Sequence, residues 1–215
     1  LGRIVEEYKK RVGDLAKSMA NEMGAPLNFA ATAQVGAGIG GFLGTIEALK
    51  TFEFSERHGA NLVVYEPIGV VGMITPWNWP LNQIALKVAP ALAGGNTMVL
   101  KPSEECPGNA AIFAEILDAA GVPPGVFNLV QGDGPGVGAA ISAHKDIEMV
   151  SFTGSTRAGI LVAKAAADTV KRVHQELGGK SPNLVLPDAD LATVLPPTVS
   201  GVLINTGQSC IAPTR

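Results

Sequence analysis

The stretch Val70-Val-Gly-Met-Ile-Thr75 is an uninterrupted apolar run that ends on a hydroxyl side chain. A short run without polar alternation is typical of a strand that helices cover on both faces of a parallel sheet. A helix is predicted over residues 80–94, and residues 97–100 predict the next apolar strand. This strand–helix–strand order predicts a right-handed βαβ unit.

The same alternation continues on either side of this unit. Further strands are predicted at residues 62–65, 126–130, 148–152, 172–176 and 184–186, and further helices at residues 107–120, 136–143 and 157–167. Alternation at this spacing predicts an α/β fold with a Rossmann-like, mostly parallel sheet and flanking helices.

Helices are also predicted before and after this sheet. Residues 3–23 carry apolar side chains at steps of three and four, and Gly24 ends this amphipathic helix. A second apolar face runs over residues 39–52, and both helices are expected to serve as scaffold. A last helix is expected after Asp188-Ala-Asp190, a good N-cap region. Because prolines disrupt helix interiors, Pro196-Pro197 leave open whether this helix kinks there or only begins there.

The composition bounds the possible partners. The chain has 215 residues, of which 47% are hydrophobic and 16% charged, with a net charge of −3, so it can bury a core and shows no sign of a nucleic-acid or membrane partner. Residues 29–46 are uncharged but small, which makes a membrane span an unfavoured interpretation. Two cysteines favour a reducing, cytoplasmic location. Leu1 opens inside a predicted helix without a secretory signal or initiator Met, which suggests a fragment.

Cys210 is the best candidate nucleophile. It lies in the polar turn Gly207-Gln-Ser-Cys210, at an expected helix terminus that favours thiolate, whereas structural cysteines usually lie in apolar runs. Cys106 has acidic neighbours and is interpreted as incidental. His58, His144 and His174 show no metal-like spacing, so no metal site is predicted.

Two further side chains suit the same chemistry. Glu176 ends a predicted strand beside Gly178-Gly179, where a confined carboxylate can act as a general base; the alternative is a surface glutamate. Asn78 lies between two tryptophans and two prolines, where its amide can donate to an oxyanion; the alternative is a turn asparagine that bonds its own backbone.

Two motifs suit a nucleotide. The turn at Gly154-Ser155 opens a helix that continues through Gly159, so free N–H groups there can meet a phosphate, although a plain helix start reads the same way. Lys101-Pro-Ser-Glu104 follows a strand, at the edge where such sheets bind ligands, and can hold ribose hydroxyls; an exposed charged loop is the alternative. The Glu104 carboxylate would repel a 2′-phosphate, which favours NAD over NADP.

Together these motifs closely resemble the NAD(P)-dependent aldehyde dehydrogenase superfamily. The resemblance rests on five ordered motifs: Pro76-Trp-Asn78, Lys101-Pro-Ser-Glu104, Phe152-Thr-Gly-Ser-Thr156 with Gly159, Glu176-Leu-Gly-Gly-Lys-Ser-Pro-Asn183 and Gly207-Gln-Ser-Cys210. It implies that Cys210 is the nucleophile, Glu176 the base and Asn78 the oxyanion donor in the oxidation of an aldehyde to an acid through a thiohemiacetal and a thioester. It also implies a set of cofactor-binding residues, namely Thr75, Pro76, Trp77, Lys101, Ser103, Glu104, Gly134, Gly154, Ser155, Gly159, Leu177 and Gly178.

The resemblance further implies a domain order: N-terminal helices over residues 1–60, an NAD-binding domain over residues 61–178, and the start of a catalytic domain over residues 179–215. Family members continue well beyond the cysteine and form homo-oligomers, dimers or tetramers. The chain alone is therefore expected to bind cofactor weakly and to turn over poorly. Two alternatives stay open: a relative that passes the acyl group to coenzyme A or phosphate, and a non-catalytic protein with the same fold. The aldehyde is not predicted.

Overall fold

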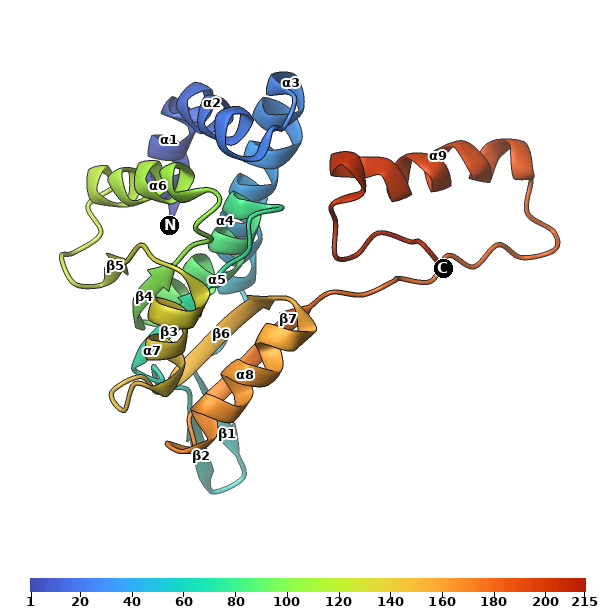
Figure 1. Ribbon diagram of the computed structural model, residues 1–215. Coiled ribbons are helices and arrows are strands. Elements are labelled where there is room, and N and C mark those ends of the chain that lie inside the picture. The colour runs from blue at the N-terminus through green and yellow to red at the C-terminus, as the bar shows by residue number, and fades with distance from the viewer.

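A five-stranded parallel sheet, in the order β5-β4-β3-β6-β7, forms the centre of the molecule (Figure 1). The computed structural model describes residues 1–215. The strands are β3 (Val70–Ile74), β4 (Thr97–Lys101), β5 (Phe127–Leu129), β6 (Met149–Gly154) and β7 (Arg172–Leu177). Residues 71–74 of β3 are buried, which confirms the strand covered on both faces that its sequence predicts. The α/β fold class is also confirmed.

The strand order places a topological switch point at the centre of the sheet. The chain runs outward from β3 through β4 to β5, then returns to β6, which pairs with β3 on its other side. Residue Ile74 of β3 is paired with Lys101 on one side and with Phe152 on the other. The carboxyl ends of β3 and β6 therefore diverge into opposite connections, and ligands of open α/β sheets bind in the crevice at such a point.

Four helices connect these strands. They are α5 (Pro80–Ala93), α6 (Pro107–Ala119), α7 (Ala139–Ala143) with the π-helical turn η2 (Gly134–Gly138) before it, and α8 (Thr156–Ala167). Proline is the first residue of α5 and of α6, where its missing N–H costs nothing. At Gly72 a Cβ atom would lie 2.4 Å from Cγ2 of Ile141, so glycine is required for α7 to pack on β3.

The N-terminal helices cover one side of this unit. They are α1 (Gly2–Lys10), α2 (Val12–Met23), α3 (Leu27–Phe29), the π-helical turn η1 (Ala30–Gln34) and α4 (Val35–Leu49). The single helix predicted over residues 3–23 breaks at Arg11, whose φ of −106° is not helical. Gly24 ends α2 in the left-handed conformation, as expected.

The continuous helix over residues 27–49 is 23 residues long, and an 18-residue window within it has a mean hydropathy of 1.3, so it is long and apolar enough to cross a membrane by length and composition alone. Its side chains nevertheless join the protein core. Val35 and Phe42 are buried there, and the Tyr8 hydroxyl donates a hydrogen bond to the Val35 carbonyl oxygen. A Cβ atom at Gly41 would lie 3.1 Å from that of Ala85, so α4 and α5 approach closely. One face of this helix therefore packs in the core, while 28% of its apolar window is buried.

Two expectations for the connections need correction, and the open question of where the last helix begins is answered. Strand β2 (Asn61–Val64) exists, but it pairs antiparallel with β1 (Ser55–His58) outside the main sheet, because Gly59 turns the chain with a φ of 62°. The strand expected at residues 184–186 is wrong, since this segment is exposed and irregular. Helix α9 (Leu191–Leu203) begins directly after Asp190, whose carboxylate caps the N–H of Ala192, so both prolines lie inside the helix.

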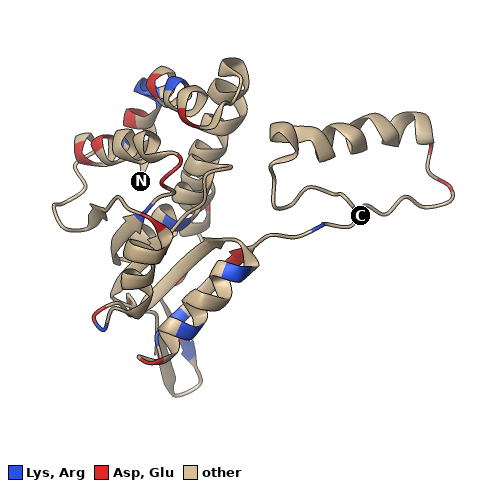
Figure 2. Cartoon of the chain, in the orientation of Figure 1, with Lys and Arg blue, Asp and Glu red and all other residues tan.

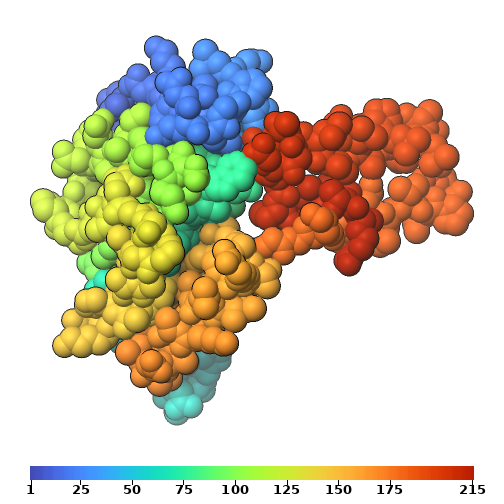
Figure 3. All heavy atoms as spheres, viewed as in Figure 1, coloured from blue at the N-terminus to red at the C-terminus, as the bar shows by residue number.

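Residues 180–215 form an arm that extends away from the body of the molecule (Figures 1 and 3). Helix α9 buries none of its residues and contains no charged residue, whereas charged residues are spread over the body (Figure 2). The arm returns to the body near its end, where the 3-10 turn η3 (Ile204–Gly207) precedes Cys210. In the arm only Asn205 and Ala212 are buried.

Candidate active site

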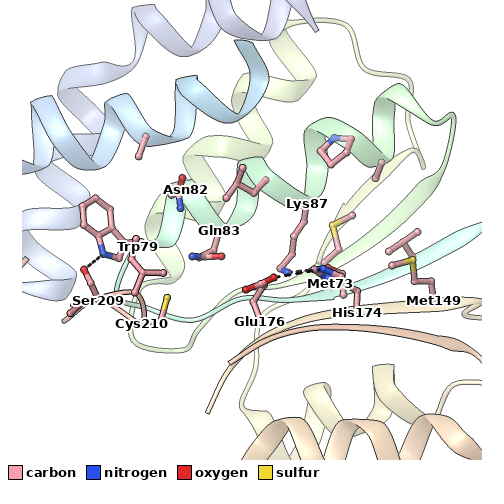
Figure 4. A pocket seen from close by; sticks show the side chains of 18 of the residues that line it. Met73, Trp79, Asn82, Gln83, Lys87, Met149, His174, Glu176, Ser209 and Cys210 are labelled. Atoms are coloured by element: carbon pink, nitrogen blue, oxygen red, sulfur yellow. Dashed lines mark hydrogen bonds and ion pairs between the residues drawn. The ribbon is translucent and has the colours of Figure 1, made fainter. Parts of the chain in front are cut away.

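A cavity of about 970 Å3 lies where the end of the arm meets α5 and the sheet. Cys210 and Glu176 both line it, although 34 residues separate them in the chain. Figure 4 shows Cys210 beside Trp79 and Ser209, and Glu176 beside Lys87 and His174. The structure therefore brings the predicted nucleophile and the predicted base to one cavity.

A strained turn delivers Cys210 to this cavity. Asn205, Thr206 and Gly207 have φ values of 52°, 58° and 76°, so three successive residues adopt the left-handed conformation. This conformation is rare for a β-branched residue such as Thr206 and persists only where neighbouring contacts hold it. The turn ends with Ser209, whose Oγ accepts a 2.7 Å hydrogen bond from Nε1 of Trp79. Cys210 is half-buried, and its backbone N–H donates no hydrogen bond to the backbone.

Asn78 is attached to the same turn. Its Nδ2 donates a 3.0 Å hydrogen bond to the carbonyl oxygen of Gln208, two residues before Cys210. The Asn78 side chain does not bond its own backbone, so the turn interpretation of this residue does not hold. Asn78 lies outside the lining of the cavity, but its amide has a second hydrogen that can be donated elsewhere.

Glu176 lies at the end of the edge strand β7, where it pairs with Thr153 of β6. Its side chain is 64% exposed, and its Oε1 lies 3.8 Å from Nε2 of His174. The confined setting expected for this carboxylate is therefore wrong for the chain described here. Its place on the cavity wall comes from β7, whose side chains alternate between the two faces of the sheet.

Lys101 ties the end of β4 to the loop before η2. Its buried Nζ donates hydrogen bonds to Oε2 of Glu104, at 2.9 Å, and to the carbonyl oxygen of Gly132, at 2.8 Å. The hydrogen bond from Lys101 and backbone N–H groups that include that of Gly134 hold the pKa of Glu104 below its usual range. The Lys101–Glu104 motif is therefore an ordered element and not a loose charged loop.

The turn after β6 is also ordered. The Oγ of Ser155 caps α8 by accepting a 3.2 Å hydrogen bond from the N–H of Ala158. A Cβ atom at Gly159 would lie 2.7 Å from Cδ2 of Leu177, so glycine allows α8 to pack closely on β7. Gly154 and Leu177 are paired at the ends of β6 and β7.

Two orphaned hydroxyls mark the switch point. The Oγ1 atoms of Thr75, after β3, and of Thr153, near the end of β6, are buried and have no hydrogen-bond partner. Buried hydroxyls are normally paired, so each is available to a bound polar group. With the N-terminus of α8 at the same sheet edge, these groups fit a phosphate-containing cofactor.

The family model described as "Aldehyde dehydrogenase family" matches residues 1–215. The chain belongs to the aldehyde dehydrogenase family. The family membership predicted from five short motifs is thus confirmed over the whole chain.

Individual aldehyde dehydrogenases show the same likeness. The chain is 57% identical over 216 residues to a 3-succinoylsemialdehyde-pyridine dehydrogenase from Pseudomonas sp and covers 45% of it. It is 54% identical to aldehyde dehydrogenase C from Pseudomonas syringae, solved as a mutant with NAD+ and octanal, with a TM-score of 0.97 over 100% of this chain and 44% of that one. An aldehyde dehydrogenase from Bartonella henselae gives 52% identity and a TM-score of 0.95 over 99% of this chain and 45% of that one. The chain thus spans somewhat less than half the length of these aldehyde dehydrogenases.

Sequence reasoning missed one notable residue of this aldehyde dehydrogenase chain, Lys87. It is buried in α5, lines the cavity, and donates a 2.9 Å hydrogen bond to Oγ of Ser151. Burial lowers its pKa to about 8, and the nearby Glu176 carboxylate partly opposes this shift. A signal was present, because Lys87 is the only charged residue between Glu66 and Lys101.

The pKa of Lys87 predicts a pH-dependent stability. Because the folded pKa of Lys87 lies below the usual value of 10.5, the unfolded state binds more protons than the folded state between pH 8 and 10.5. The free energy of unfolding therefore rises as the pH rises through that window. The shift corresponds to about 3 kcal/mol. Lys87→Met should therefore gain stability over the wild type at pH 7 and lose that gain by pH 10.5, as measured by urea unfolding. The exposed Lys164→Met variant serves as control, and a pH-independent difference for Lys87→Met would contradict the assignment.

Proposed function

We propose that this chain is the cofactor-binding and nucleophile-bearing part of an enzyme that oxidises an aldehyde to a carboxylic acid with NAD+. The observation that supports this most is the shared cavity of Cys210 and Glu176. The orphaned hydroxyls of Thr75 and Thr153 at the adjacent switch point supply a place for the cofactor. NAD+ accompanies the aldehyde dehydrogenase of Pseudomonas syringae and that of Bacillus cereus in their solved structures.

The reaction begins at Cys210. Its thiolate attacks the aldehyde carbon, which forms a C–S bond and moves the carbonyl electron pair onto oxygen. The Cys210 N–H, which has no backbone partner, and the second amide hydrogen of Asn78 are the donors proposed for this oxyanion. The hydrogen bond from Asn78 to Gln208 links the Asn78 amide to the turn that carries the Cys210 N–H.

The proposed place for the cofactor is the carboxyl edge of the sheet, beside the orphaned hydroxyls of Thr75 and Thr153. When bound, NAD+ would supply the hydride acceptor that oxidation of the aldehyde carbon requires, and Cys210 would then hold the acyl group as a thioester. The residues proposed to hold NAD+ are Thr75, Pro76, Trp77, Lys101, Ser103, Glu104, Gly134, Gly154, Ser155, Gly159, Leu177 and Gly178. Lys101 acts through Glu104 and the Gly132 carbonyl, which it holds in place.

Glu176 completes the cycle. Its carboxylate takes a proton from water, the water oxygen attacks the thioester carbon, and the C–S bond breaks to release the acid and regenerate the thiolate. Lys87 lines the same cavity. A base is needed for hydrolysis and dispensable for transfer to coenzyme A or phosphate, so Glu176 favours hydrolysis over the acylating alternative.

The test compares residues 1–215 with a chimera in which they replace the matching part of the Pseudomonas 3-succinoylsemialdehyde-pyridine dehydrogenase. The chimera should form NADH from aldehydes, whereas residues 1–215 alone should bind NAD+ weakly and turn over poorly. Glu176→Gln in the chimera should give one burst of NADH and little turnover, because the thioester persists. Turnover that requires coenzyme A or phosphate would establish the acylating alternative, and an inactive chimera with normal NAD+ binding the non-catalytic one.

The remaining expectations stay proposals. We propose the domain division at residues 60 and 178, a homo-oligomer for the complete enzyme, and a reducing, cytoplasmic location that suits the two free thiols. A small-molecule aldehyde is the proposed partner. Gel filtration of the complete enzyme and thiol counting in cell lysate check the oligomer and the location.

A further inference from the structure

Gln34 is a fully buried amide in a part of the chain that carries none of the residues assigned above. It ends the π-helical turn η1, and its exposed fraction is 0%. A π turn places one extra residue in the helix and re-aims the side chains around it, and such turns are frequent at functional sites. Here the helix places Gln34 beside the segment that precedes α5. Its Oε1 atom has no hydrogen-bond partner, which is a costly arrangement for a merely structural residue.

The amide of Gln34 joins two distant segments. Its Nε2 donates 3.1 Å hydrogen bonds to the carbonyl oxygen of Asn78 and to Oδ1 of Asn205. Asn205 in turn donates from Nδ2 to the same Asn78 carbonyl, at 2.8 Å, and to the Gln208 carbonyl, at 3.2 Å. Asn78 closes the network through its own bond to Gln208.

This network explains how the strained turn before Cys210 persists. The arm is otherwise exposed, and Asn205 is one of its two buried residues. Asn205 adopts the left-handed conformation more readily than most residues do, whereas the β-branched Thr206 adopts it only at a cost. The hydrogen bonds of Gln34 and Asn205 therefore offset this strain and hold the turn against Asn78.

We propose that Gln34, acting through Asn205, is a positioning residue that sets the Cys210 turn relative to the Asn78 amide. The inference rests on the proposed function for its catalytic consequence, but its structural part stands alone. Gln34 does not line the cavity that Cys210 and Glu176 share. Without it, the thiol and the oxyanion donors still exist, but their mutual geometry is no longer held.

The test uses Gln34→Met, which keeps the volume and removes the donor, and Gln34→Glu, whose carboxylate faces two acceptors. Thr32→Ala, an exposed residue of the same helical turn, is the matched control. In residues 1–215, hydrogen exchange in the segment 205–212 should quicken at least about tenfold in both Gln34 variants, because amides such as those of Gln208 and Ala212 are bonded inside this turn. Exchange in β4 and α6 should stay unchanged.

Asn205→Gly gives a second approach that leaves the core intact, since glycine accepts the left-handed conformation. Asn205→Gly should quicken hydrogen exchange in the same segment. In the double variant Gln34→Met/Asn205→Gly, exchange there should be no faster than in either single variant. Unchanged exchange at 205–212, or faster exchange throughout, would overturn the proposal. In the chimera, kcat should fall at least about tenfold with KM within about twofold. If the unaltered chimera is inactive, the proposed function fails while the exchange result still decides the positioning role.

Discussion

Replacing Cys210 by alanine in the chimera should lower kcat for aldehyde oxidation by at least about 10^4-fold, the scale of losing a covalent nucleophile. The half-buried thiol lines the cavity with Glu176, and no other cysteine does. The residual rate would come from the cavity and the oxyanion donors, which the substitution leaves in place. Steady-state NADH formation with a saturating aldehyde measures this effect.

Cys106→Ala is the matched control for that experiment. Cys106 lies at the N-terminus of α6, where its Sγ lies 4.0 Å from the carbonyl oxygen of Trp77, and it does not reach the cavity. Its loss should leave kcat within about twofold once the fraction of folded protein is matched. Equal losses for the two alanine variants would mean that Cys210 is not the nucleophile.

The two thiols should also differ in alkylation by more than 100-fold within residues 1–215. Cys106 is 1% exposed, and its burial, together with the nearby carboxylates of Glu22 and Glu105, raises its pKa to about 12. At pH 7.5 such a thiol is thiolate in only about one molecule in 10^4 to 10^5, and the thiolate is the reactive form. Cys210 is half-buried and faces a cavity, so iodoacetamide can reach it.

Mass spectrometry of the alkylated peptides over time gives both rates from one sample. In guanidinium chloride the two rates should converge, because unfolding removes the burial of Cys106. If Cys210 reacts as slowly as Cys106 in the folded chain, the nucleophile assignment is untenable. Addition of NAD+ gives a further comparison, since a cofactor bound at the adjacent sheet edge should slow only Cys210.

Much of the fold was predictable because its signals are local. The apolar run of β3 and the helices predicted over residues 80–94 and 107–120 each follow from neighbouring residues, and the structure confirms them. Two strand predictions needed correction for a tertiary reason. Residues 62–65 and 184–186 both look like strands, yet one lies in a separate hairpin and the other has no pairing partner. A strand depends on the chain beside it, which its own residues do not specify.

The functional site was likewise only partly predictable from the sequence. Their residue types and short motifs were enough to predict Cys210, Glu176 and Asn78 as candidate site residues. Lys87 and Gln34 were not predicted as site residues, because burial is what distinguishes a lysine or glutamine in a helix, and burial is a tertiary property. The expected confinement of Glu176 was wrong because β7 is an edge strand, and sheet order is a tertiary property.

By itself, the sequence determined the α/β fold class with its parallel sheet, the protein family and a set of candidate reactive side chains. These could be predicted because periodicity and short motifs involve residues that are close together in the chain. Only the tertiary structure decided that Cys210 and Glu176 share a cavity, that the switch point falls between β3 and β6, and that Gln34 holds Asn78 to the Cys210 turn. The physical reason is that these relations are made by hydrogen bonds and packing between residues as far as 171 positions apart. Such contacts leave no pattern in the intervening chain.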